Sequence, residues 1–174
     1  MSRLSLVLRV PRPADAEALV AFNVATASDY GRLVPEPDEV LTDVEVQREM
    51  LEDLDVTTGP SLLLAAFAGE ALAGTVTLFA VSLFKVRHVV ELGIAVHPES
   101  RRMGVGRVLL EAAIAHATAQ PQLEKIVLRV FAENEPAISL YRSAGFIEEG
   151  RQRSQYLFRD GTRHDAIWMA KFLR

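Results

Sequence analysis

Residues 91–117, which read ELGIAVHPESRRMGVGRVLLEAAIAHA, decide the fold of this chain. An apolar strand leads through a short turn into a helix with one apolar face. Two glycines stand where the helix begins, so its first backbone N–H groups are unpaired and open to close approach. These donors and the positive end of the helix dipole favour an anion, and Arg101, Arg102 and Arg107 add charge at the same end. The segment therefore predicts a site for a pyrophosphate group.

The spacing around the glycines separates three kinds of phosphate site. A P-loop needs lysine and then serine or threonine after its last glycine, but arginine and valine follow Gly106. A dinucleotide fingerprint needs a third glycine where Leu109 stands, and an acid at the end of the next strand, whereas Glu124 lies at its beginning. The remaining pattern, Arg-x-x-Gly-x-Gly from Arg101, resembles the coenzyme A pyrophosphate loop of the GNAT superfamily of acyl-CoA-dependent N-acyltransferases. A plain helix start is the alternative for this motif taken alone.

A second segment, residues 128–150 (LRVFAENEPAISLYRSAGFIEEG), reads as a strand, a short helix and another strand. Asn134 can cap the helix, and Gly145 suits the left-handed residue after its end. Phe146 is then expected to pack back on Tyr141. The pattern Asn-x-x-Ala-x-x-x-Tyr-x-x-x-Gly-Phe resembles the second GNAT signature. Both signatures occur in the order that is typical of the superfamily, so the chain as a whole resembles its members.

Length and composition fit one compact enzyme domain. The chain has 174 residues, 49% of them hydrophobic, which is enough for one core, so we expect a single N-acetyltransferase domain over residues 1–174. It has no cysteine and four scattered histidines, which argues against disulfides, a thiolate nucleophile and a metal site. A net charge of -4 without a basic face argues against nucleic-acid binding. Without a signal-like start or an apolar run of spanning length, we expect a cytoplasmic protein with no membrane role.

Periodicity predicts an α/β fold of mixed strand direction. Strands are expected at 4–10, 61–68, 71–84, 86–96, 124–131, 146–158 and 162–172, and helices at 13–30, 42–55, after the two glycines, and at 135–144. Asp160 and Gly161 mark a hairpin turn between the last two strands. The resemblance implies a single-domain GNAT-type fold: a mixed, mostly antiparallel central sheet flanked by helices, with a splayed strand pair holding the cofactor.

The resemblance implies acetyl-CoA as the acyl donor and extends the cofactor site beyond the arginines. The predicted cofactor-binding residues are Ile94, Ala95, Val96, Arg101, Arg102, Met103, Gly104, Val105, Gly106, Arg107, Asn134, Ala137 and Tyr141. Backbone N–H groups of strand 93–96 can polarise the thioester carbonyl if that edge is free. Gly93 is expected to mark a bulge beside the pantetheine, with simple packing as the alternative.

Two residues are predicted to carry the chemistry. Glu91, two residues before Gly93, is the candidate base that removes a proton from the attacking amine, acting through a water. The alternative for Glu91 is an exposed residue or a partner of Arg87, and His88 could share its role. The family comparison implies that Tyr141 is the acid for the leaving thiolate, although it can instead hold the sulfur and fill space.

The acceptor is indicated less clearly. Residues 36–55 carry nine acids against one arginine, which favours a cationic amine or simply a solvated helix face. The C-terminal hairpin has the opposite charge and could meet a carboxylate through Arg151, Arg153, Arg159 and Arg163. Arg129 stands where the ribosomal-protein branch has an acid, which disfavours a protein N-terminus. We therefore expect a small primary amine, with an amino acid favoured, acetylated by direct attack in a ternary complex.

Other possibilities stay open at this stage. A protein N-terminus and a polyamine are the alternative acceptors, and an acyl-CoA sensor without catalysis is the alternative of another class. A homodimer is possible, because the apolar residues Ile167, Trp168 and Met169 of the last strand could pair across a dimer. The same three residues could instead complete the core of the monomer.

Overall fold

The computed structural model describes residues 5–28, 35–53 and 59–174. Short 3-10 turns lie at Pro13–Asp15 and Pro98–Ser100. The strands are β1 (Leu6–Arg9), β2 (Leu62–Ala68), β3 (Ala71–Ala80), β4 (Val89–Val96), β5 (Lys125–Phe131), β6 (Ile147–Leu157) and β7 (Arg163–Phe172). The helices are α1 (Ala16–Ala27), α2 (Val44–Glu52), α3 (Val105–Ala119) and α4 (Glu135–Ser143). This is the predicted α/β order.

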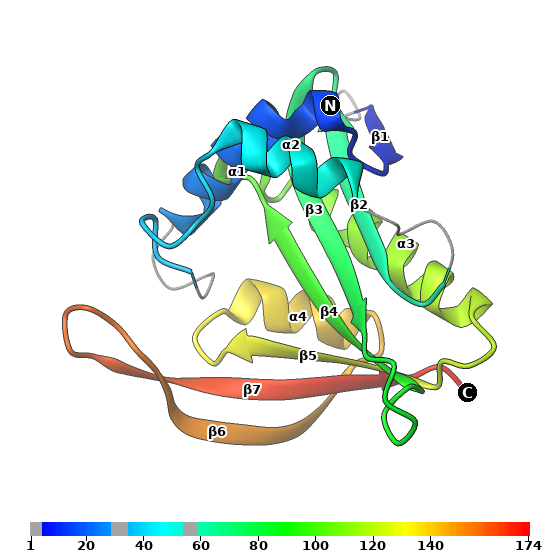
Figure 1. The fold of residues 1–174 in the computed structure, drawn as a ribbon. Coiled ribbons are helices and arrows are strands. Elements are labelled where there is room, and N and C mark those ends of the chain that lie inside the picture. The colour runs from blue at the N-terminus through cyan, green and yellow to red at the C-terminus, as the bar shows by residue number, and fades with distance from the viewer. Residues whose placement is uncertain (1–4, 29–34, 54–58) are drawn as a thin grey trace.

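In the described residues the strands form one seven-stranded sheet in the order β1-β2-β3-β4-β5-β7-β6. The pair β4–β5 is parallel, and every other neighbouring pair is antiparallel. Figure 1 shows β2, β3 and β4 running at a steep angle to β5, β7 and β6, so that the sheet opens into two halves. The halves meet where β4 begins, which places the opening of the sheet between β4 and β5.

Two hydrophobic clusters hold the layers together. The larger one joins the inner face of α3, through Leu109 and Leu110, and Ile138 of α4 to the sheet. The smaller one joins Leu19 and Phe22 of α1 to β2 and β3. Helices α1 and α2 pack on β2 and β3, whereas α3 and α4 both belong to the larger cluster (Figure 1).

Several element boundaries differ from the predicted ones. The apolar runs predicted two strands meeting near residue 85, but β3 ends at Ala80 and β4 begins at Val89. Residues 81–88 form an exposed turn, and the side chains of Leu83 and Phe84 lie mostly in solvent. Both strands were therefore predicted too long, because the prediction relied on apolar composition alone. Tyr30 and Asp55, the expected ends of the first two helices, lie outside the described residues.

The C-terminal hairpin forms as predicted. Gly161 has φ 84°, and Phe158 N–H donates to Thr162 O at 2.9 Å across the turn. In β7, Ile167 and Met169 are 5% and 0% exposed and belong to the larger core cluster. These two residues therefore complete the monomer core, whereas Trp168 is only partly buried and lies outside that cluster.

Candidate active site

The opening between β4 and β5 begins at Glu91. Parallel pairing of the two strands is limited to three residue pairs, Val89–Lys125, Val90–Ile126 and Glu91–Val127. Beyond them, β4 continues to Val96 with β3 as its partner on the other side. In the described chain, the edge of β4 after Glu91 that faces β5 therefore carries no ladder hydrogen bonds. Its outward N–H groups are available to an extended ligand, which is the splayed strand pair that the resemblance implies.

The bulge predicted at Gly93 is absent from the described β3–β4 ladder. Pairing runs in register from Gly74–Val96 to Ala80–Val90, with Gly93 opposite Thr77. A Cβ on residue 93 would lie 2.8 Å from Oγ1 of Thr77, so the glycine is explained by close packing of the neighbouring strand. The prediction of a bulge was wrong, because the ladder is regular at this point and Thr77 of β3 explains the glycine.

The start of α3 has the backbone of an anion site. Gly104 is the N-cap with φ 87°, and Arg102 also has a left-handed backbone with φ 60°. No atom would contact a Cβ on Gly104, so the glycine is needed for its conformation and not for room. The first N–H of the helix to bond back is that of Val108, which donates to Gly104 O at 3.1 Å. The preceding N–H groups point out of the helix end beside the arginines.

A cavity of about 390 Å³ connects this helix start with the free edge of β4 and with α4. Its lining contains all the predicted cofactor-binding residues except Met103, which is half exposed beside it. Those in the lining are Ile94, Ala95, Val96, Arg101, Arg102, Gly104, Val105, Gly106, Arg107, Asn134, Ala137 and Tyr141. The motifs predicted from two separate segments thus converge on one hollow.

The lining also contains Thr26, Ser100, Pro136 and Leu140, which sequence reasoning missed. Pro136 and Leu140 lie on the α4 face that carries Ala137, so helical spacing could have found them. Thr26 gives no such signal: it comes from α1, is buried, and its hydroxyl donates to Phe22 O at 2.8 Å.

Helix α4 brings Tyr141 into the cavity. Asn134 caps the helix by accepting the N–H of Ala137 at 3.4 Å, and Gly145 follows its end with φ 87°. The Phe146 ring lies 5.8 Å from that of Tyr141, as predicted. Tyr141 is 8% exposed, and this burial raises the pKa of its phenol to about 12. The hydroxyl therefore stays protonated and can donate a hydrogen bond into the cavity at any physiological pH.

Glu91 lies outside the cavity lining, on the other face of the sheet. Its neighbours Val90 and Leu92 point into the core that contains α3, so alternation turns Glu91 away from it. The Oε1 atom of Glu91 accepts from Arg129 Nη2 at 3.2 Å and from Nε at 3.4 Å. Its charged partner is thus Arg129 and not Arg87, whose guanidinium stacks on Phe84 at 4.3 Å. His88 lies in the turn before β4 and accepts Glu124 N–H through its carbonyl.

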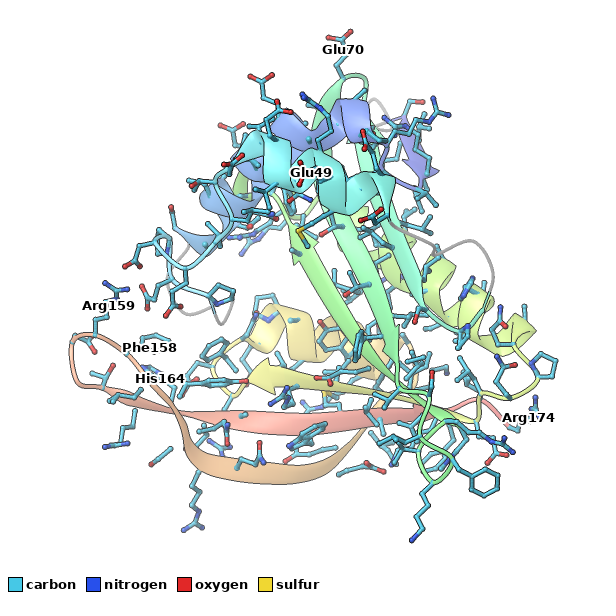
Figure 2. All side chains as sticks on the ribbon, viewed as in Figure 1. Glu49, Glu70, Phe158, Arg159, His164 and Arg174 are labelled. Carbon is cyan, nitrogen blue, oxygen red and sulfur yellow. The ribbon has the colours of Figure 1, made fainter. Side chains whose placement is uncertain are left out.

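The hairpin arginines considered for carboxylate binding are partly committed elsewhere. Arg151 Nε donates to Asp165 at 2.7 Å, and the same carboxylate accepts the N–H of Ser154 at a bulge of β6. Arg159, at the outer end of the hairpin, pairs with Asp38 and reaches toward Glu36 (Figure 2). The acidic segment before α2 therefore contacts the basic hairpin, and part of each charge excess is balanced by the other.

Among the described residues, no cluster of three or more histidine, aspartate or glutamate side chains could hold a metal ion. No described helix has both the length and the apolar character needed to cross a bilayer.

Comparison with known proteins decides the family. Residues 26–146, more than half of the chain, match the model of the acetyltransferase (GNAT) family. The chain belongs to this family. The fold and the two motifs that predicted GNAT membership agree with it, and the protein is an acyl-CoA-dependent acetyltransferase with acetyl-CoA as its acyl donor.

The similarity to GNAT relatives extends over nearly all of the chain. It is 30% identical over 167 residues to the L-amino acid N-acetyltransferase AaaT of Escherichia coli strain K12, covering 95% of this chain and 97% of that protein. It is 39% identical over 102 residues to the ribosomal protein bS18-alanine N-acetyltransferase of the same strain, covering 56% and 64%.

The fold agrees closely with solved GNAT structures. A GNAT acetyltransferase from Streptococcus pneumoniae superposes with a TM-score of 0.89 at 30% identity, covering 97% of this chain and 99% of that one. The yncA acetyltransferase of Salmonella typhimurium, solved with its cofactor acetyl-CoA, superposes with a TM-score of 0.83 at 20% identity over 98% and 95%. This second likeness supports the fold.

Proposed function

We propose that this chain acetylates the primary amine of a small molecule, with an amino acid as the favoured acceptor, by direct attack in a ternary complex. The observation that carries the proposal is the opening between β4 and β5, which has a cavity with a phosphate-type helix start on one face and Glu91 on the other. Two substrates can enter from opposite faces and meet at the free edge of β4. The full-length similarity to an L-amino acid N-acetyltransferase supports an amino acid acceptor.

The residues of the cavity fit acetyl-CoA. The N–H groups at the start of α3, with Arg101, Arg102 and Arg107 beside them, suit the pyrophosphate, and the apolar side chains of β4 and α4 suit the pantetheine arm. Outward N–H groups of β4 between residues 93 and 96 are placed to hydrogen-bond the thioester carbonyl. The bound donor supplies an activated acetyl group, and the protein orients it along β4.

Glu91 is proposed to accept the proton of the amine, directly or through a water. An alkyl ammonium has a pKa near 10.4, so at neutral pH a base must remove its proton before nitrogen attacks. The N–C bond forms as the C–S bond breaks, and the leaving sulfur must be stabilised. Tyr141 is the candidate donor for that task, because it lines the cavity and its phenol stays protonated.

The high pKa limits what Tyr141 can do. A thiol such as cysteine has a pKa near 8.5, so moving a proton from a phenol of pKa about 12 is uphill by about 5 kcal/mol. We therefore propose that Tyr141 stabilises the leaving thiolate with a hydrogen bond, and that the sulfur receives its proton from solvent or from the one released by the amine.

Ligand-dependent thermal stability, followed by thiol release, tests the proposal. Acetyl-CoA at a hundred times its dissociation constant stabilises by about 2.7 kcal/mol, which raises the midpoint of this chain by roughly 5–10 °C, and NAD and ATP serve as controls. Free thiol is then measured with amino acids, polyamines and peptides as acceptors. A shift with NAD but none with acetyl-CoA would contradict the cofactor assignment.

Protein N-termini and polyamines remain the alternative acceptors, and an acyl-CoA sensor remains the alternative class. A Glu91→Gln, Tyr141→Phe double variant separates sensor from enzyme: the enzyme loses turnover, whereas a sensor keeps its function. A cytoplasmic location belongs to the proposal, because acetyl-CoA is an intracellular metabolite. So does a homodimer, for which β6 offers the free edge of the sheet, and light scattering tests it.

A further inference from the structure

The face of the sheet opposite the cavity carries an accessible ion pair at the point where β4 and β5 separate. Nη2 and Nε of Arg129 both donate to Oε1 of Glu91, at 3.2 and 3.4 Å. The two side chains are 41% and 42% exposed. Within the described chain, Oε2 of Glu91 accepts no hydrogen bond, and Arg129 donates to no other group. Both charges therefore keep unused hydrogen-bonding capacity that faces solvent.

The Arg129 guanidinium is held in place from a second direction. Arg129 lies opposite Trp168 in the β5–β7 ladder, and its guanidinium carbon is 5.1 Å from the centre of the indole ring. An arginine fixed by an aromatic ring and a carboxylate presents its planar fork in a defined orientation, which suits bidentate binding of a carboxylate. An exposed ion pair contributes little to stability, so ligand binding is the better reason for this arrangement.

The spacing of the two charges matches a free α-amino acid. In such a molecule one carbon separates the amine from the carboxyl group, so nitrogen and carboxylate oxygen are roughly 3 Å apart. The Glu91 and Arg129 atoms are 3.2 Å apart with the opposite polarity. We propose that Arg129 binds the α-carboxylate of the acceptor while Glu91 receives its α-ammonium, so that this pair selects zwitterionic amino acids. This inference rests on the proposed N-acetyltransferase function.

The same pair disfavours the other acceptors. A protein N-terminus has a peptide carbonyl where the free amino acid has its carboxylate, and therefore leaves Arg129 without an anionic partner. A polyamine brings further cations toward the guanidinium. The hairpin does not offer an equivalent site through Arg151 or Arg159, because these side chains are paired with Asp165 and Asp38.

Steady-state kinetics on matched acceptors test the inference. Free amino acids are screened with acetyl-CoA, and the best one is compared with its α-amide and its decarboxylated amine, alongside a dipeptide and spermidine. The variant is Arg129→Gln, and Arg142→Gln, at an exposed, ion-paired residue of α4, is the matched control. Arg129→Lys keeps the charge without the fork. Thermal shift with acetyl-CoA checks that each variant folds and binds its donor.

The wild type should acetylate the amino acid with a kcat/KM about 10- to 100-fold above that of the α-amide, as expected for a charge-assisted contact. Arg129→Gln should remove this preference, mainly by raising the KM for the amino acid. The kcat/KM for the α-amide and the KM for acetyl-CoA should change by less than about twofold. Arg129→Lys should lie between, and Arg142→Gln should behave as wild type.

Two results would overturn the inference while leaving an N-acetyltransferase. One is equal acetylation of amino acid and amide by the wild type. The other is an equal loss on both acceptors in Arg129→Gln, which would mean that Arg129 has only a structural role. Acetylation of none of these amines would refute the proposed function, and the inference with it.

Discussion

The burial of Tyr141 predicts a measurable dependence of stability on alkaline pH. The folded protein holds this phenol at a pKa of about 12, whereas an unfolded tyrosine has a pKa near 10. Between these values the unfolded chain loses the proton and the folded chain keeps it. Stability from the neutral buried ring is therefore complete below pH 10 and is lost as the pH rises toward 12.

The size of this loss follows from the two pKa values. At pH 8 both states keep the proton, so the loss of stability is close to zero. At pH 11 this ionisation lowers the free energy of unfolding by about 1.4 kcal/mol. Above pH 12 the loss approaches about 2.7 kcal/mol. For a chain of 174 residues, 1.4 kcal/mol corresponds to a midpoint change of about 3–6 °C.

Comparison with Tyr141→Phe isolates this contribution from the other alkaline titrations. Urea unfolding of both proteins is measured at pH 8 and pH 11, and the wild type should lose about 1.4 kcal/mol more than the variant over that interval. Tyr156→Phe is a useful companion, because Tyr156 is half-buried and its pKa is also raised, chiefly by burial. If wild type and Tyr141→Phe lose the same stability, Tyr141 ionises freely in the folded state and is not buried as the structure has it.

The same variant also tests catalysis. If Tyr141 donates a hydrogen bond to the leaving thiolate, its removal should lower kcat about 10- to 100-fold at pH 7, with little change in the acceptor KM. If the phenol were an obligatory proton donor, its removal would lower kcat further. If it only filled space, its removal would hardly change kcat. Enzymatic rates and alkaline stability thus report two independent consequences of one buried hydroxyl.

Four further substitutions have expected outcomes. Gly74→Ala would place a Cβ 2.9 Å from the backbone oxygen of Ala95 and should cost about 1–3 kcal/mol in urea unfolding, whereas Gly150→Ala, with open space around it, should change stability by less than about 0.5 kcal/mol. Gly106→Ala adds a methyl at the cavity lining and should weaken acetyl-CoA binding at least tenfold in titration calorimetry, without unfolding the helix. Arg159→Gln should leave both the acceptor KM and the stability in urea unfolding essentially unchanged, because Arg159 is paired with Asp38 and the lost ion pair is exposed.

The residues of the candidate cofactor cavity could be predicted to lie together because the information for them is local. The left-handed Gly104, the capping Asn134 and the left-handed Gly145 each serve a backbone need within a few residues of themselves. Local backbone requirements of this kind appear in the sequence as short motifs, and in the structure these motifs lie around one cavity. The sheet strands between them were found by periodicity, with errors mainly where an apolar run continues beyond the last ladder pair, as after Ala80.

The proposed acceptor site could not be predicted because its contacts join segments that are far apart in the sequence. Glu91 and Arg129 are 38 residues apart, and Arg159 and Asp38 are 121 apart. The prediction of a bulge at Gly93 failed because the residue that explains this glycine, Thr77, lies on another strand. Which outward-facing residues meet depends on where β4 and β5 stop pairing, and neither strand's own sequence reports this point.

This division suggests how one GNAT scaffold changes its acceptor. The proposed donor site uses mainly backbone groups, whereas the proposed acceptor site depends on single side chains that point outward from β4 and β5 and contribute little to the core. An arginine at position 129 places a positive charge within hydrogen-bonding distance of the proposed base, and an acid there would reverse the local charge. Such an exchange changes which acceptor is attracted without disturbing the cavity or the fold. Acceptor choice in this chain should therefore respond to substitution at 129 far more than acetyl-CoA binding does.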